Sequence, residues 1–431
     1  MNSPISVNRP RHSPTPSSSG SVAVLGCVAG VGVTGRQMLI TDFRRRHDHL
    51  PRERPRFPRG PRDVRRAHVR RRPRPAVHLP TLGPWPSCRS SVGEWLTHDL
   101  AGDLMIMLSS ALVLACLWFV LRAATGARVD RDSLLALTTA TWAGMMLIEP
   151  VWLNAGFAQV NIVIMGLVIL DLVPRKRFLP QGTLIGIAAA IKISPLAMLL
   201  FFLLRRDLKA ILTAVVSALA ATGIAALIRW DATVEFFSSV LLGMGTESEF
   251  GVDSAYQSNS SLKGMIMRWY LTPESLDAHS TQANVIWLVL SLATIILGGW
   301  FMIALMRRDM LVDAALVNAV IMLLISPVSW SHHWVWLTLL LPVVAWRCAT
   351  TLGAPVFLSA WVILWTALVL HEPPKWWYGD SIEVHALTFT EKLLVSDFVW
   401  LAIVLLIAWA VALRGVPGRR LRRSRRDPDI A

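Results

Sequence analysis

The sequence predicts an all-α, polytopic integral membrane protein with about nine or ten membrane segments. Hydrophobic residues make up 54% of the 431 positions and charged residues only 16%, which is low for a soluble domain. Long apolar runs recur from about residue 104 onward, as expected for helices that cross a bilayer. The formal net charge of +15 gathers in an N-terminal stretch, a C-terminal tail and the short loops between apolar runs. Cytoplasmic loops of membrane proteins have this distribution, so the charge does not indicate a nucleic-acid partner.

Ten apolar segments account for the predicted membrane domain, residues 99–415. In chain order they are 104–124, 134–149, 157–173, 181–204, 209–229, 284–305, 311–327, 333–347, 355–370 and 396–413. Excess Lys and Arg assign one set of connections to the cytoplasm: 122–131, 175–177, 205–209, 307–308 and the basic tail 416–431. The outer side then collects residues 150–157, 230–283, 328–333 and 371–395.

The segment 181–204 does not fit a single crossing. Basic residues flank it at both ends, so one crossing would place a basic cluster on the outer side. It also contains Lys192-Ile193-Ser194-Pro195, and proline breaks the hydrogen-bond ladder of a helix. We therefore predict a re-entrant hairpin or broken helix with Lys192 at its tip. Irregular backbone at membrane depth is tolerated where it lines a cavity enclosed by protein.

Residues 1–98 form an atypical N-terminal region. Residues 44–74 hold 14 Arg in 31 positions, with many Pro and His, which is typical of a disordered basic tail. The apolar piece 21–35 is short and Gly-rich, which makes it a weak helix candidate. A second interpretation is a frame error over roughly residues 40–95. A one-base shift lets one permitted set of codons for residues 76–82 read Leu-Pro-Phe-Thr-Tyr-Pro-Pro-Leu.

Two adjacent histidines, His332 and His333, follow Pro327 at the outer rim of a membrane segment. Ionisable groups at such depth are costly and usually functional. Imidazole can bind a metal, act as an acid or base, or donate to a phosphate oxygen. No further His, Asp, Glu or Cys set with metal-site spacing accompanies the pair, so we predict no metal and no cofactor. Neighbouring helical residues point about 100° apart, so one ring should face a cavity and the other should pack.

Three further polar side chains are candidates for the same site. Lys192 is a lone cation near the middle of an apolar segment, where it suits a phosphate or carboxylate partner. The alternative for Lys192 is a lysine that snorkels to the surface. Gln159 and Asn161 open the segment 157–173 at its outer end, and the alternative for them is ordinary polar contact between helices.

The outer loops carry weaker signals. Asn259 lies in a polar run, residues 256–264, whose Gln, Asn and Ser suit sugar hydroxyls, although polar loops often have this composition. Trp376, Trp377 and Tyr378 fit either an aromatic belt at the membrane interface or stacking on sugar rings. We favour the belt.

Five motifs in a fixed order resemble a known family. They are Glu149-Pro150, Gly156–Asn161, Lys192–Pro195, Leu203–Asp207 and Ser326–Trp334. Together they resemble the actinobacterial polyprenol-phosphate-mannose-dependent α-(1→2)-mannosyltransferases, which elaborate phosphatidylinositol mannosides, lipomannan and lipoarabinomannan. The resemblance covers about residues 100–415, and its specific parts are the Ser326–Trp334 run and the order of the set.

The resemblance implies a GT-C fold in the cell membrane with its active face on the extracytoplasmic side. It implies a polyprenyl-phosphate-mannose donor, a mannosylated lipid acceptor and membrane lipids as partners, with no nucleotide sugar and no cofactor. A carboxylate would take the proton of the acceptor hydroxyl as that hydroxyl attacks mannose C1. Lys192 and His332 or His333 would meet the leaving phosphate. Gln159 and Asn161 would hold sugar hydroxyls or backbone, and Asn259 is a further candidate for substrate binding.

The sequence departs from the family in three places. Ala158 stands where the family usually has Gly, and Asn259-Ser260-Ser261 stands where it has Asn-Gln-Ser. The family's first membrane helix and the acidic residue taken as its catalytic base have no readable counterpart in frame, and Asp42 matches by position only. The catalytic base is therefore unassigned. One alternative to the enzyme is an inactive remnant, and the other is a transporter or lipid-carrier flippase with a broken helix around a central cation.

Overall fold

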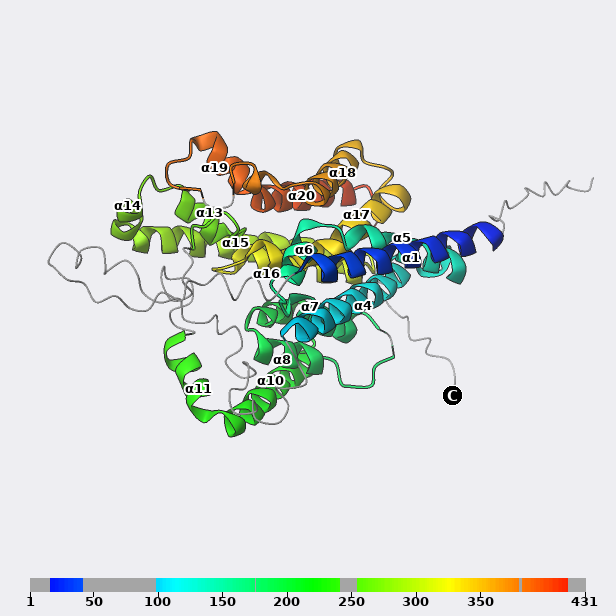
Figure 1. The fold of residues 1–431 in the computed structure, drawn as a ribbon, viewed down its shortest axis with the longest axis horizontal. Coiled ribbons are helices and arrows are strands. Elements are labelled where there is room, and N and C mark those ends of the chain that lie inside the picture. The colour runs from blue at the N-terminus through cyan, green and yellow to red at the C-terminus, as the bar shows by residue number, and fades with distance from the viewer. Residues whose placement is uncertain (1–15, 42–97, 175, 241–253, 380–381, 418–431) are drawn as a thin grey trace, which may run out of the picture.

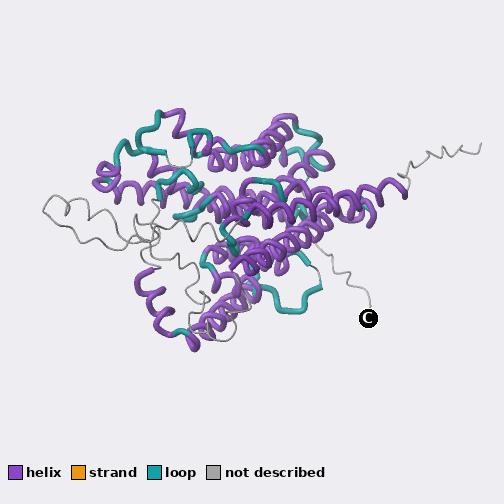
Figure 2. The backbone as a smooth tube through the Cα atoms, in the orientation of Figure 1, coloured by secondary structure: helices purple, strands orange, loops and turns teal. Residues whose placement is uncertain are grey.

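The chain is described by a computed structural model over residues 16–41, 98–174, 176–240, 254–379 and 382–417 (Figure 1). These residues form helices and loops, as the tube trace in Figure 2 makes plain, together with one isolated β-bridge between Asn259 and Trp330. The predicted all-α class is confirmed. Asp42 and the Arg-rich stretch 44–74 lie outside the described residues.

The helices follow the predicted apolar segments closely. The α-helices are α1 (Pro16–Ile40), α4 (His98–Thr125), α5 (Arg131–Met145), α6 (Glu149–Gly156), α7 (Asn161–Leu172), α8 (Thr183–Ile191), α9 (Leu199–Leu204), α10 (Leu208–Ile228), α11 (Trp230–Glu235), α13 (Leu262–Arg268), α14 (Pro273–Ala278), α15 (Ser280–Met306), α16 (Leu311–Ile325), α17 (Leu337–Thr350), α18 (Val356–Leu370), α19 (Phe389–Val395) and α20 (Asp397–Leu413). Short 3-10 or π turns are η2 (Gly126–Arg128), η3 (Ser194–Met198), η4 (Phe236–Val240), η5 (Ser331–Trp336) and η6 (Pro374–Trp376).

The helices include enough long apolar members for a multi-pass membrane protein. Among the described residues, 5 helices are long and apolar enough to cross a bilayer, or up to 7 if each bent pair counts as one span. Three shorter apolar helices, α7, η3 with α9, and α16, also belong to the bundle. The expected nine or ten segments therefore include members that are too short to cross alone. The helix α16 is one of them, and it is buried from Val312 to Leu324, so protein rather than lipid surrounds it.

The helix α1 is the first difference from expectation. Its Gly-rich composition suggested a weak helix, yet it is 25 residues long and lies along α5 (Figure 1). A Cβ atom at Gly30 would fall 2.0 Å from the Trp142 ring, so the glycines allow close helix packing. Thr34 bonds Ser110 at 2.7 Å, which ties α1 to α4. The membrane bundle thus begins well before residue 99.

The segment between α7 and α10 is re-entrant, as predicted. The helix α8 ends at Ile191, the next residue Lys192 is extended with φ of −150° and ψ of 132°, and η3 and α9 follow. Gly182 lies against Ala210, and one turn later Gly186 lies against Ala214, so α8 and α10 run parallel. The chain therefore enters the bundle at residue 182 and returns to the same end by residue 210.

Asp171 holds the start of this re-entrant segment against the end of α7. Its carboxylate, at the end of α7, accepts from the backbone N–H of Gly182 at 2.8 Å and of Ile185 at 2.9 Å. It satisfies N–H groups that the first turn of a helix leaves without partners, and it meets the positive end of the helix dipole of α8. Because α7 and α8 are joined at this end, Asn161 and Lys192 meet at the other end, which we call the site end of the bundle.

The close contact of α8 with α10 leads to a stability prediction. We expect Gly186→Ala to lower the free energy of unfolding by about 1–3 kcal/mol, because its Cβ would fall 2.3 Å from the carbonyl oxygen of Ala214. Gly223→Ala on α10 is the matched control, since nothing lies within 4 Å of its Cβ and alanine favours helix. Thermal unfolding midpoints in detergent measure the difference. Equal midpoints for the two variants would contradict the close packing.

Candidate active site

The loop that carries the two histidines, residues 326–336, is held in place by a second loop, residues 254–261. We call them the His loop and the Ser loop. The helix α16 ends at Ile325 because Ser326, with ψ of 138°, precedes Pro327 and leaves the helical region. The backbone of Ser260 then donates to the carbonyl of Ser329 at 2.8 Å. The two loops are therefore joined by backbone pairing.

Asn259 is the centre of this junction. Its Oδ1 accepts from the backbone N–H of Ser329 at 2.9 Å, and its Nδ2 donates to the carbonyls of Ser254 and Pro327. Its exposure is 0% and both of its N–H donors are used. In this structure the Asn259 amide holds the His loop, and the sugar contact at Asn259 stays a prediction.

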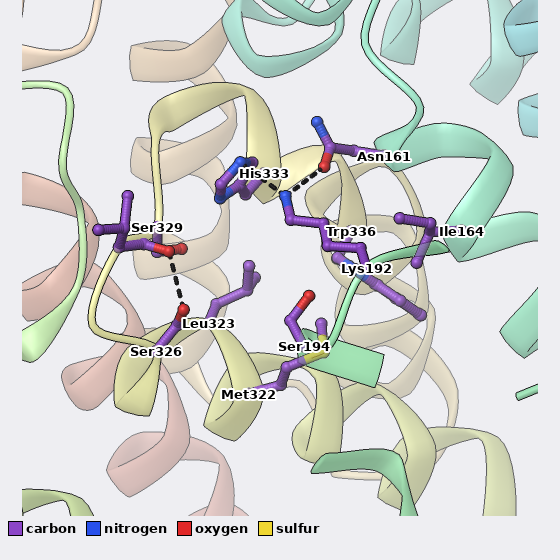
Figure 3. A pocket seen from close by; sticks show the side chains of 11 residues that line it. Asn161, Ile164, Lys192, Ser194, Met322, Leu323, Ser326, Ser329, His333 and Trp336 are labelled. Carbon is purple, nitrogen blue, oxygen red and sulfur yellow. Dashed lines mark hydrogen bonds between the residues drawn. The ribbon is translucent and has the colours of Figure 1, made fainter. Parts of the chain in front are cut away.

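Lys192, Asn161 and His333 meet at the site end of the bundle (Figure 3). Nζ of Lys192 lies 3.0 Å from Oδ1 of Asn161 and 2.8 Å from Nε2 of His333. The three side chains come from the break after α8, the start of α7 and η5. They line a cavity of about 30 Å³ that also receives Ser194 and Trp336. A space of this size holds about one or two water molecules, so a larger ligand would require side chains to move.

The hydrogen bond between Lys192 and His333 depends on which of the two nitrogens donates. Nδ1 of His333 accepts from the backbone N–H of Trp330 at 3.1 Å, so the neutral ring carries its hydrogen on Nε2. A protonated lysine has three N–H donors and no acceptor. Nζ of Lys192 and Nε2 of His333 lie 2.8 Å apart, so a neutral amine accepts from the ring, whereas with a protonated amine both nitrogens are donors that one anionic oxygen could bond.

The two histidines have different surroundings. His333 lines the cavity, whereas the His332 ring lies 5.4 Å from the Phe157 ring and 4.7 Å from the His333 ring. This agrees with the expected division between one ring that faces the cavity and one that packs.

Asn154 is a site residue that the sequence reasoning missed. Its Oδ1 accepts from Asn161 at 3.2 Å and its Nδ2 donates to the carbonyl of Gln159 at 3.1 Å, which fixes the start of α7. The Gln159 side chain does not line the cavity. Ala158 has a φ of +47°, a conformation that favours glycine, which is the residue that the family resemblance led us to expect at that position.

A second polar cluster lies behind the His loop, and the sequence reasoning named Glu149 in a motif without assigning it to a site. Glu149, at the start of α6, accepts from Ser331 Oγ at 2.6 Å and from Trp376 Nε1 at 2.7 Å. Lys375 forms a salt bridge with Asp397 at 3.1 Å and donates to Ser331 Oγ at 3.2 Å. A carboxylate within an apolar segment is the signal that could have identified Glu149.

Comparison with known proteins identifies the family. The model of glycosyltransferase family 87 matches residues 91–327, which is more than half of the chain. A polyprenol-phosphate-mannose-dependent alpha-(1-2)-phosphatidylinositol mannoside mannosyltransferase of Mycobacterium tuberculosis is 29% identical over 371 residues, 81% of each chain. The protein of the same name from Mycolicibacterium smegmatis is 34% identical over 212 residues, 46% of this chain and 44% of that one.

No solved structure matches the chain. The resemblance expected from the five ordered motifs is nevertheless confirmed, because the family match and these relatives agree with it. Taken with its multi-pass helical bundle, the chain belongs to glycosyltransferase family 87 and is a membrane glycosyltransferase.

Proposed function

We propose that this protein transfers mannose from polyprenyl-phosphate-mannose to a mannosylated glycolipid, forming an α-(1→2) linkage on the extracytoplasmic face of the membrane. The names of the related mannosyltransferases support both the donor and the class of acceptor. The cavity at Lys192, Asn161 and His333 is the proposed site of the donor phosphate.

The close approach of Lys192 and His333 in the cavity carries this proposal. An anionic phosphate oxygen would favour the protonated amine, and an oxygen bonded to both nitrogens would accept two charge-assisted hydrogen bonds. Asn161 holds Lys192 from the other side, so the amine is oriented before the ligand arrives. Preorganised donors of this kind stabilise charge that develops on a leaving group.

The transfer step is an inverting displacement at mannose C1. The bond from C1 to the phosphate oxygen breaks and a bond to the acceptor oxygen forms. Polyprenyl phosphate leaves with the electron pair, and a carboxylate takes the proton of the acceptor hydroxyl. The family resemblance implies a carboxylate in the loop after the first helix; this chain has no assigned counterpart, and Asp42, outside the described residues, matches by position only.

The distribution of basic residues supports the extracytoplasmic assignment. Arg177 donates to the carbonyl of Asp171, at the end of α7 that lies away from Asn161. Arg308 follows α15 and donates to the carbonyl of Val416, again at the end opposite to Ser326. Because Lys and Arg favour the cytoplasmic side of membrane proteins, the site end faces the opposite compartment.

The test uses the purified full chain in liposomes with radiolabelled donors. Polyprenyl-phosphate-mannose is expected to give a labelled glycolipid when a mannosylated phosphatidylinositol is present, whereas GDP-mannose gives none. Digestion with an α-(1→2)-specific mannosidase should release the label. Transfer from GDP-mannose would contradict the proposal. Movement of intact labelled lipid between leaflets without a new glycosidic bond would also contradict it and would favour the flippase.

A further inference from the structure

We propose that Tyr256, Trp330 and Trp376 form an aromatic platform that binds a pyranose ring of the acceptor, with Glu149 accepting a hydrogen bond from a hydroxyl of that sugar. This inference rests on the proposed function and adds an acceptor subsite to it. We call the three rings with Glu149 the acceptor platform.

The three rings come from three separate parts of the chain. Tyr256 belongs to the Ser loop, Trp330 to the His loop and Trp376 to η6. The Tyr256 ring lies 6.2 Å from the Trp330 ring and 6.5 Å from the Trp376 ring, with interplanar angles of 60° and 61°. All three residues are partly exposed. Rigid aromatic rings offer large contact area at low entropic cost.

Glu149 supplies the polar part of the platform. Its carboxylate accepts from Trp376 Nε1 at 2.7 Å and from Ser331 Oγ, and the residue is partly exposed. An ionised carboxylate has about four acceptor positions. Ser331 Oγ lies against both carboxylate oxygens and Trp376 Nε1 against one, which leaves capacity for one sugar hydroxyl. Binding sites that combine aromatic walls with a few fixed polar groups are typical of small polar ligands.

The neighbouring Trp377 provides an internal comparison. Trp377 is 52% exposed and its Nε1 donates to the carbonyl of Glu372 within the same loop, as in an interfacial belt. Trp376 turns inward toward Tyr256 and Glu149 instead. The belt interpretation therefore suits Trp377, whereas Trp376 belongs to the acceptor platform.

The platform is rigid and adjoins the proposed donor site. Lys375, next to Trp376, has 0% exposure, bonds Ser260 and Ser331, and pairs with Asp397. The backbone N–H of Trp330 donates to His333, which lines the donor cavity. A sugar on the platform would thus lie beside the phosphate cavity, as a transfer between two bound substrates requires.

The test compares Trp376→Ala with Trp377→Ala in the liposome assay, varying donor and acceptor separately. We expect Trp376→Ala to raise the KM for the mannosylated acceptor about tenfold and to leave the KM for polyprenyl-phosphate-mannose unchanged. Trp377→Ala should leave both KM values unchanged. Trp376→Phe keeps a ring but removes the bond to Glu149, so its acceptor KM should rise by about threefold. This conservative variant also keeps the test valid if Trp376→Ala folds poorly.

The outcomes separate this inference from the proposed function. A wild-type chain that transfers mannose, with equal acceptor KM in the wild type, Trp376→Phe and both alanine variants, would overturn the platform and leave the function intact. A fall in kcat with both KM values unchanged would mean that Trp376 is only structural, which also overturns the platform. A wild-type chain with no transfer from polyprenyl-phosphate-mannose would refute the function on which the platform depends.

Discussion

Replacing Lys192 with methionine is expected to lower kcat/KM for mannosyl transfer by about 10²–10³-fold. Methionine has a similar length but cannot donate a hydrogen bond or carry charge to the leaving phosphate. Asn161 and His333 would both lose the partner that lies 3.0 and 2.8 Å away. The measurement is initial transfer rate per folded protein in liposomes, with the folded fraction determined by size-exclusion chromatography.

Lys209→Met is the matched control for this substitution. Lys209 is an exposed lysine at the start of α10, at the end of the bundle opposite to the site. Its removal changes the net charge by the same amount but touches no group of the cavity, so activity should stay near the wild-type value. Wild-type kcat/KM in Lys192→Met would show that the cavity does not stabilise the leaving group.

Replacing Lys375 with methionine is expected to lower the free energy of unfolding by about 3–5 kcal/mol. Lys375 is fully buried, and its ammonium group pairs with Asp397, bonds Ser260 and Ser331, and lies 3.1 Å from the centroid of the Phe398 ring. Its removal leaves a buried carboxylate without its cation and releases η6 from the two loops. Thermal unfolding in detergent measures the effect.

The double variant Lys375→Met/Asp397→Leu tests whether the stability lost in Lys375→Met comes from the uncompensated charge of Asp397. Replacing both members of a buried ion pair with apolar residues removes the uncompensated charge, so we expect the double variant to recover a large part of the stability. A double variant as unstable as the sum of the two single variants would contradict the assigned pairing.

The arrangement of the bundle follows from patterns that are local in sequence. Apolar runs bounded by basic residues predict the positions of the helices, because a bilayer requires long apolar segments and cytoplasmic loops collect Lys and Arg. The break at Lys192 was predictable because Pro195 and two basic flanks conflict with one straight crossing. The close contact of α1 with α5 was not predictable. Glycine lowers helix propensity, so the Gly-rich run suggested a weak helix. Only the structure shows that the Trp142 ring occupies the space beside Gly30.

The candidate site was predictable only in part, because some of its contacts join residues that are far apart in the sequence. Lys192, Asn161 and His333 are polar groups placed against an apolar background, and the structure brings them together. The position of Asn259 behind the His loop depends on pairing between residues about 70 positions apart. The inward turn of Trp376 depends on Glu149, which is 227 positions away, and no local pattern distinguishes Trp376 from Trp377.

The most direct test of the donor-phosphate site is the affinity of the protein for polyprenyl phosphate, the leaving group without its sugar. Isothermal titration with wild-type, His333→Ala and His332→Ala protein separates the ring that lines the cavity from the ring that packs on Phe157. We expect His333→Ala to weaken binding by about tenfold or more, as loss of a charge-assisted hydrogen bond implies, and His332→Ala to have a smaller effect. Equal affinity in all three proteins would contradict the assignment of this cavity to the donor phosphate.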